Sequence, residues 1–315
     1  MKKLLTITAA VLLSLCMPAQ TKVTFVPQWT PQSQFAGYYL ALEKGFYAQE
    51  GLDVTIKHMG ANSSESVCDQ LFNGNAQIVG MQLLQAAIAR ADGCNILNVF
   101  QLTQKSGLWC IGHNPLTCPE DLDGLRIGRW KVGFSEFCDI LEAYKGIHIN
   151  WIPFIQGINM FVFGAVDAIL CYNYSEYIAI RMAMGDIEDD HVLKFSEYGY
   201  DCPEDGLYVR EDYYDGNRET VEKFVRASKK GWDYARQHPE EAVDISMRYV
   251  KEANVVSDRT HQKLMLEEYL HLQDNPATGK ADYAPVDRKI FEEMNEALIN
   301  TGYTTRKIDF DEIIR

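Results

Sequence analysis

The side chains best suited to chemistry in this sequence are aromatic, amide and carboxylate groups that follow predicted β-strands. Trp29, Gln34 and Phe35 come directly after the first predicted strand. Groups of the same kinds follow later strands, namely Asn62, Gln82, Trp130, Phe134, Tyr172, Asn173 and Glu176. In open α/β sheets, the carboxyl ends of strands and the free N–H groups of helix N-termini face the ligand crevice. We therefore predict that these residues line a cleft that binds a small, flat, polar ligand.

Each of these positions also has an ordinary structural interpretation. Trp29 and Phe35 could pack in the core or form a hydrophobic staple at a helix start. Asn62 could serve only as a helix cap, and the Glu176 carboxylate could simply be favoured by the helix dipole. The residue types and their positions leave both interpretations open.

No catalytic signature accompanies the predicted cleft. Gly60, Gly74 and Gly80 do not form a phosphate-binding loop, and the seven histidines have no partnered Ser or Cys nearby in sequence. The eight cysteines form no CxxC pair and do not lie at metal-ligand spacing to histidine. We therefore predict a binding protein without catalytic activity, cofactor or metal. An enzyme whose catalytic residues assemble only in space is the alternative.

The composition argues against a nucleic-acid partner. The chain has 315 residues, a formal net charge of −14 and a pI of about 5.0. The basic patch or stripe that is usual in nucleic-acid binders is therefore not expected. With 47% hydrophobic residues, the chain is long enough to form two lobes with separate cores.

The N-terminal segment has the order of regions found in a secretory signal peptide. Lys2 and Lys3 precede an apolar run over Leu4–Leu15, and small residues follow near Ala19. The run is shorter than the ~20 residues that a membrane-spanning helix needs. We predict a signal peptide over residues 1–20 and an exported, periplasmic protein. The chain is either lipid-anchored through Cys16 or soluble after cleavage near Ala19.

Strand and helix patterns alternate along the first part of the chain. Strands are predicted at Val23–Val26, Leu52–Ile56 and Ala76–Val79. Helices are predicted over Phe35–Gln49 and over residues 62–74, the second one with Asn62, Ser63 and Ser64 as candidate N-caps. This alternation predicts an α/β fold with a largely parallel sheet.

Two crossings divide the chain into two predicted lobes. The first lobe is predicted at 21–112 and 208–315, and the second lobe at 113–207, with hinges near 110–116 and 202–208. A domain that the chain enters once and leaves once has two crossing strands, which make a hinge with a cleft between the lobes. The C-terminal part is predicted to be helical, at Arg218–Gln237, Pro239–Val250, Asp258–His271 and Asp287–Asn300.

Several segments together resemble the thiamin-pyrimidine-synthase-like branch of periplasmic binding proteins. They are Gln28–Tyr39, Glu43–Tyr47, Glu50–Val54, Phe72–Ala76, Asp121–Gly124, Gly164–Ala168, Tyr172–Tyr177 and Pro203–Gly206. The resemblance implies a two-lobed type II periplasmic binding protein fold. Bacterial members of this branch are substrate-binding proteins of ABC importers for thiamin precursors such as formylaminopyrimidine, and related members bind nitrate, sulfonate or riboflavin-type ligands.

The resemblance also implies roles for individual residues. Trp29 and Phe35 would contact the ligand ring, Tyr172 would form a second stacking face, and Glu176 would accept hydrogen bonds from an amino group on a pyrimidine-like ring. The implied partner is an ABC permease in the inner membrane. In the family pattern the Glu directly follows the Asn, whereas here two residues separate Asn173 from Glu176, which predicts a displaced carboxylate.

Two other functions stay open as alternatives. The first is an enzyme of pyrimidine biosynthesis, because the same fold can carry different functions. The eukaryotic members that synthesise the pyrimidine carry a cysteine cluster, and this sequence lacks one, which argues against that alternative. A sensor that binds its ligand in order to signal is the second.

Overall fold

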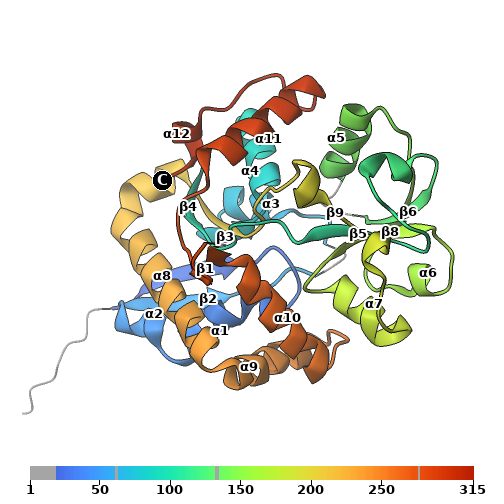
Figure 1. Ribbon diagram of the computed structural model, residues 1–315. Coiled ribbons are helices and arrows are strands. Elements are labelled where there is room, and N and C mark those ends of the chain that lie inside the picture. The colour runs from blue at the N-terminus through green and yellow to red at the C-terminus, as the bar shows by residue number, and fades with distance from the viewer. Residues whose placement is uncertain (1–18, 61–62, 132–134, 276) are drawn as a thin grey trace, which may run out of the picture.

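The computed structural model describes residues 19–60, 63–131, 135–275 and 277–315. These residues form two α/β lobes, each built around its own five-stranded sheet (Figure 1). The signal peptide and Cys16 lie outside the described residues.

The first lobe contains a mixed sheet with the strand order β2-β1-β3-β10-β4. Its strands are β1 (Thr21–Val26), β2 (Leu52–Ile56), β3 (Ile78–Met81), β4 (Ile96–Gln101) and β10 (Gly206–Arg210). β1 pairs in parallel with β2 and β3, whereas β10 runs antiparallel between β3 and β4. The carboxyl ends of β1, β2 and β3 therefore lie at one edge, which faces the second lobe.

The second lobe contains a mixed sheet with the order β7-β6-β8-β5-β9. Its strands are β5 (Leu108–Gly112), β6 (Arg126–Trp130), β7 (Asn150–Phe154), β8 (Ala168–Tyr172) and β9 (Val192–Lys194). β6 pairs in parallel with β7 and β8, and β5 runs antiparallel to β8 and β9. In each sheet, a strand next to a crossing runs antiparallel to its neighbours, β10 in the first sheet and β5 in the second. For this reason neither sheet is as fully parallel as the alternation of strands and helices alone predicts.

Twelve α-helices lie in the described part of the chain, and most cover the sheets. In the first lobe they are α1 (Ala36–Glu43), α2 (Phe46–Gln49), α3 (Val67–Phe72), α4 (Leu83–Ala91), α8 (Glu211–Gln237), α9 (Pro239–Glu252), α10 (Arg259–Leu272), α11 (Arg288–Asn300) and α12 (Phe310–Ile313). In the second lobe they are α5 (Ser135–Lys145), α6 (Asn159–Val162) and α7 (Glu176–Met184). A short hairpin of β11 (Asp274–Asn275) and β12 (Lys280–Ala281) follows α10.

The long C-terminal helices agree with the periodicity of the sequence, but two N-terminal predictions are wrong in detail. The helix predicted over Phe35–Gln49 is divided at Gly45, whose φ of 70° is left-handed, so α1 ends before α2 begins. The helix predicted to start at Asn62 starts at Val67 instead. Its cap is Ser66, which forms a reciprocal capping box with Asp69.

The two crossings between the lobes lie side by side. The first runs over residues 102–107, between β4 and β5, and the second ends at Asp205, just before β10. The Leu102 N–H donates to the Asp205 carbonyl at 2.9 Å, and the Glu204 N–H donates to Thr103 Oγ1 at 3.1 Å. A boundary after residue 112 would leave β5 in the first lobe, whereas its pairing with β8 and β9 places it in the second sheet.

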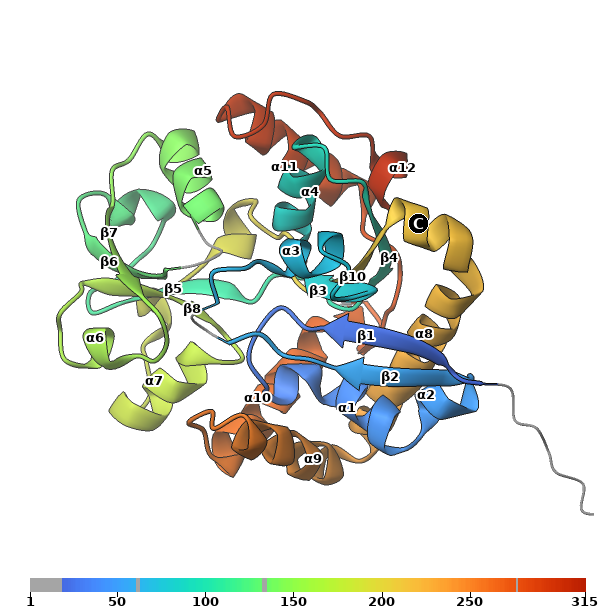
Figure 2. The ribbon, with the colours of Figure 1, turned by 180° about the vertical axis from the view of Figure 1, so that it is seen from behind.

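Three hydrophobic clusters form the core. One lies between the first sheet and α1, α8, α9 and α10, and a second lies beneath α3, α4 and α11 (Figure 2). The third fills the second lobe. Trp29 and Tyr172 are half-buried and pack against both the first cluster and that of the second lobe. These two rings therefore lie where the lobes meet.

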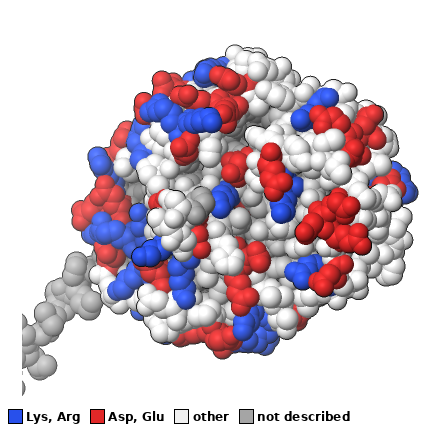
Figure 3. Space-filling view, viewed as in Figure 1, with Lys and Arg blue, Asp and Glu red and all other residues white. Residues whose placement is uncertain are grey.

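The surface is charged and mixed. Acidic and basic side chains are interspersed over the face seen in Figure 3. Exposed ion pairs occur among the described residues, for example between Arg259 and Glu240 at 2.6 Å. This pattern is typical of a solvated face. Among the described residues, no helix combines the length and the apolar character needed to cross a membrane.

Candidate functional site

A cavity of about 430 Å³ lies between the lobes. Its walls come from the segments that follow β1, β2 and β3 in the first lobe and β6 and β8 in the second. Six of the predicted site residues line it, namely Trp29, Gln34, Gln82, Trp130, Tyr172 and Glu176. This volume falls in the range of ordinary small-molecule pockets.

Trp29 forms the aromatic part of the first-lobe wall, and the half-buried His58 holds its backbone. His58 Nδ1 lies 2.6 Å from the Trp29 carbonyl oxygen, and His58 Nε2 lies 2.8 Å from the Tyr39 hydroxyl. Burial lowers the pKa of His58 to about 4, so the ring is neutral near pH 7. Nδ1 then donates to the Trp29 carbonyl oxygen and Nε2 accepts from the Tyr39 hydroxyl, so this chain of hydrogen bonds holds the Trp29 backbone in place.

Tyr172 and Trp130 form the aromatic part of the second-lobe wall. The Tyr172 ring stacks on Tyr174 at 5.0 Å, and the Trp130 ring lies 5.4 Å from it at an angle of 33°. Because Tyr172 is already engaged by neighbouring rings, it is less open than the second stacking face implied by the family resemblance. Its hydroxyl accepts a hydrogen bond from Gln82 Nε2 at 2.7 Å, and this bond joins the two lobes across the cleft.

Glu176 is the first residue of α7 and brings a carboxylate to the cavity wall. Its Oε2 accepts a hydrogen bond from the Tyr172 N–H at 3.1 Å. Burial raises the pKa of Glu176, while hydrogen bonds from the Tyr172 backbone and from the Trp130 side chain oppose the rise. The two residues inserted before Glu176 do not remove the carboxylate from the cleft.

The loop before Glu176 is held by both lobes. Tyr174 is 2% exposed and belongs to the core cluster of the first lobe, where its ring meets Tyr269 at 5.2 Å. His261 Nε2 on α10 lies 3.0 Å from the Ser175 carbonyl oxygen. The position of Glu176 is therefore set by contacts with the first lobe as well as by its own helix.

Asp205 holds several side chains in place on the first-lobe side of the cavity. It accepts hydrogen bonds from Gln34 Nε2 at 2.7 Å and from the side chains of Gln28 and Tyr269. Gln34 lines the cavity, but its amide nitrogen is committed to Asp205 and its oxygen accepts from Gln32. Gln34 therefore shapes the wall through this network.

Asp205 is expected to make the fold less stable as the pH rises from about 4 to about 6. Burial raises the pKa of Asp205 to about 6, so the folded chain holds this proton more tightly than the unfolded chain does. The stabilisation is complete below the ordinary Asp pKa and is lost as the pH passes through the raised value. In urea unfolding, Asp205→Asn should remove a decrease of about 2 kcal/mol between pH 4 and pH 6, out of a total of about 3 kcal/mol over the whole titration.

The comparison with Asp205→Asn separates Asp205 from Glu176 and Asp201, whose pKa values are also raised by burial and which titrate in both proteins. The pKa of Glu204 is raised by burial and by the charge of Asp205, so the difference between the two proteins reports on Asp205 together with its effect on Glu204. If the free energies of unfolding of the two proteins run parallel between pH 4 and pH 6, Asp205 does not have the environment described here.

Two predicted site residues that the structure describes do not line the cavity, and two others lie outside the described residues. Phe35 is 2% exposed and packs in the first core, with its ring 5.3 Å from that of His58. Asn173 is 8% exposed, and its N–H donates to the Gly107 carbonyl at 2.9 Å, which ties it to the first crossing. Asn62 and Phe134 lie outside the described residues.

The sequence analysis missed three residues in and around the site, Glu204, Asp205 and Tyr174. Asp205 and Glu204 are adjacent buried carboxylates directly before an apolar strand, and that juxtaposition could have marked them. Tyr174 gives no comparable signal, because its burial depends on contacts from the other lobe.

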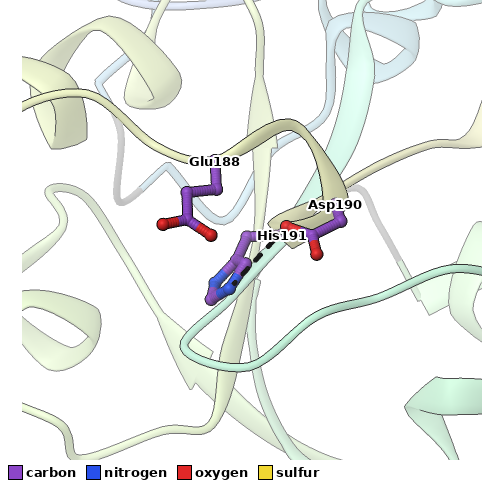
Figure 4. Close-up of side chains that lie close together, drawn as sticks. All are labelled: Glu188, Asp190 and His191. Atoms are coloured by element: carbon purple, nitrogen blue, oxygen red, sulfur yellow. Dashed lines mark ion pairs between the residues drawn. The ribbon is translucent and has the colours of Figure 1, made fainter.

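One group of possible metal ligands lies close together in the described chain, away from the cavity. Candidate ligand atoms of Glu188, Asp190 and His191 lie within 4.8 Å of one another (Figure 4). Glu188 and Asp190 are exposed, and His191 Nδ1 lies 3.1 Å from the Gly112 carbonyl oxygen. Exposed acidic groups commonly gather in this way without an ion, so we assign no metal to this loop.

Sequence comparisons relate the chain to binding proteins and to enzymes. The family model described as NMT1/THI5 like matches residues 32–242. A riboflavin-binding protein, RibY, of Chloroflexus aurantiacus is 25% identical over 94% of this chain and 85% of its own. A formylaminopyrimidine-binding protein of Halalkalibacterium halodurans is 25% identical over 79% and 76%. A 4-amino-5-hydroxymethyl-2-methylpyrimidine phosphate synthase of Aspergillus parasiticus is 23% identical over 84% and 80%.

Comparison with solved structures defines the fold. The periplasmic aliphatic sulphonate binding protein SsuA of Escherichia coli superimposes with a TM-score of 0.67, covering 95% of this chain and 92% of its own at 12% identity. The two α/β lobes and the cavity between them are thus the periplasmic binding protein fold expected from the sequence. At this identity the likeness extends to the fold alone.

Proposed function

This chain belongs to the NMT1/THI5-like family, and we propose that it is the substrate-binding component of an ABC importer. In this proposal it captures a small planar polar ligand, a thiamin-precursor pyrimidine, between its two lobes. Closure around the hinge buries the ligand and presents the surface that the permease recognises.

The observation that carries this proposal is the pairing of Trp29 with Glu176 across one cavity. An indole face offers stacking to a flat ring at a low cost in conformational entropy. A carboxylate on the second-lobe wall can accept a hydrogen bond from the amino group of an aminopyrimidine, and its charge strengthens that bond. The two groups come from different lobes, so a ligand that contacts both would favour closure.

The charges of the cavity wall favour an amino-bearing ligand over an anion. Among the described lining residues there is no Lys, Arg or His, whereas four carboxylates line the wall, those of Glu65, Asp92, Glu136 and Glu176. Sulfonate and nitrate recognition usually relies on cationic side chains or on helix N-termini, and here the N-termini of α3, α4 and α7 share the wall with these four carboxylates, which repel an anion. We therefore infer a ligand unlike the sulphonate in the name of the structural relative.

Binding without turnover fits the reactive groups of the cavity better than catalysis does. Cys68 is the cysteine among the lining residues, and burial raises the pKa of its thiol to about 12. A thiol with such a pKa is a poor nucleophile near neutral pH. The relatives named as synthases keep the enzyme as the alternative.

We further propose that the protein is exported and works in the periplasm with a permease in the inner membrane. The basic, apolar and small-residue order of residues 1–20 supports export, as does the periplasmic binding protein fold. Anchoring through a lipid on Cys16 is the finer part of this proposal. Mass spectrometry of the mature N-terminus distinguishes an acylated Cys16 from cleavage near Ala19.

A thermal-shift screen tests the ligand class. A ligand that binds only the folded state stabilises it by about 2.7 kcal/mol at a concentration of 100 Kd, which raises the melting temperature of a chain this size by several degrees. We expect this shift with an aminopyrimidine such as formylaminopyrimidine and none with alkanesulfonates or nitrate. A shift with sulfonates alone would overturn the assignment of an amino-bearing ligand.

A further inference from the structure

The second lobe meets the first lobe through apolar side chains at two places outside the ligand cavity. Ile178 lies on α7 and Ile140 lies on α5, and the two side chains are 6% and 4% exposed. Figure 1 shows α7 beside α10 and α5 beside α11, and both partner helices belong to the first lobe. Neither isoleucine lines the ligand cavity.

Both isoleucines belong to cores of the first lobe, although their helices belong to the second. Ile178 is a member of the cluster between the first sheet and α1, α8, α9 and α10, which also contains Tyr174. Ile140 is a member of the cluster beneath α3, α4 and α11. Their helix neighbours Ile180 and Leu141 belong to the second-lobe cluster instead. Each helix thus packs on its own lobe and places one isoleucine in the opposite lobe.

These contacts form without a ligand, and opening of the cleft would break them. A rotation about the two crossings separates α7 from α10 and α5 from α11, so water would reach both isoleucines and Tyr174. Exposure of apolar surface is unfavourable roughly in proportion to its area. Two polar contacts also join the lobes, Gln82 Nε2 with the Tyr172 hydroxyl at 2.7 Å and His261 Nε2 with the Ser175 carbonyl oxygen at 3.0 Å. Water can replace these hydrogen bonds in an open form, so the apolar contacts account for most of the preference for closure.

We propose that Ile140 and Ile178 keep the two lobes closed in most unliganded molecules and thereby set the ligand affinity from outside the cavity. A ligand that binds only the closed form has an apparent Kd equal to its intrinsic Kd divided by the closed fraction. When the closed form already dominates, closure takes little of the binding free energy, and the ligand enters during transient opening. The closed form is a property of the chain alone, whereas the effect on affinity rests on the proposed binding function.

Small-angle X-ray scattering of the purified chain without ligand tests the closed form. We expect the scattering curve to fit the closed arrangement of Figure 1, and the radius of gyration to stay the same when formylaminopyrimidine is added. The double variant Ile140→Ala, Ile178→Ala should have a larger radius of gyration without ligand, and formylaminopyrimidine should restore the wild-type value. Ile155→Ala makes the same change in the second lobe at a position that is 42% exposed, and it should leave the curve unchanged.

Calorimetric titration with formylaminopyrimidine tests the effect on affinity. A closed fraction that falls from about nine-tenths to about one-tenth raises the apparent Kd about ninefold. We therefore expect a loss of about 5- to 20-fold in the double variant, a smaller loss in each single variant and none in Ile155→Ala. If the isoleucines served only to stabilise the fold, the melting temperature would fall while the scattering curve and the affinity stayed as in the wild type.

Three results would overturn the inference. The first is a wild-type curve without ligand that fits only an open arrangement. The second is a folded double variant whose curve without ligand stays closed, and the third is full affinity in a variant whose lobes have opened. If the double variant does not fold, the single variants Ile140→Ala and Ile178→Ala decide by the same measurements. Scattering of the unliganded chain needs no ligand, so a failure of formylaminopyrimidine to bind would count against the proposed ligand and not against the closed form.

Discussion

Replacing Trp29 with alanine is expected to weaken ligand binding by about 5- to 150-fold. Stacking of a heteroaromatic ring on an aromatic side chain is worth about 1–3 kcal/mol by alanine substitution. Trp29 is half-buried, lines the cavity and touches the cores of both lobes, so the variant also loses a contact that closure would use. Calorimetric titration with an aminopyrimidine measures the change in Kd.

Two variants control for a general loss of structure. Trp29→Phe keeps a flat ring at the same position and should recover most of the affinity. Phe163→Ala removes an aromatic ring that is 82% exposed and should leave Kd unchanged. An unaltered affinity in a folded Trp29→Ala variant would mean that the ligand does not bind in this cavity.

Replacing Glu176 with glutamine is expected to weaken binding of an aminopyrimidine by about 10- to 150-fold. Hydrogen bonds to a charged group contribute about 1.5–3 kcal/mol, and the amide retains the shape of the carboxylate while losing its charge and one acceptor. The bond from the Tyr172 N–H to Glu176 can be kept by the amide oxygen, so the start of α7 should remain intact.

The specificity of this loss distinguishes a ligand contact from a structural role. A flat ring of similar size without an amino group should lose little affinity in Glu176→Gln, because it has no donor for the carboxylate. Glu188→Gln provides the matched change on an exposed loop. A similar loss for both compounds would show that Glu176 supports the wall and does not recognise an amino group.

Local sequence patterns predicted the elements well because those elements depend on nearby residues. Asp258 and Asp287 were expected at helix starts, and the structure has each as an N-cap that accepts backbone N–H bonds. The turn between β8 and α7 brings Tyr172 and Glu176 to the cavity from their positions at a strand end and a helix start.

Contacts between distant segments could not be predicted in the same way. Phe35 follows a strand just as Trp29 does, but the helical turn after β1 directs it into the core beside His58. Gln34 lies at the expected place in the cavity wall. Its amide nitrogen, however, donates its hydrogen bond to Asp205, which lies 171 residues later in the sequence. The crossing before β5 was misplaced because strand pairing, and not local composition, assigns β5 to its sheet.

Calorimetric titration of the purified chain with formylaminopyrimidine tests the central claim most directly. The account predicts saturable binding of one ligand per chain, with a negative change in heat capacity from apolar burial and with the losses described for Trp29→Ala and Glu176→Gln. Saturable binding that both variants retain at full affinity, or binding of sulfonates with no response to any aminopyrimidine, would contradict it.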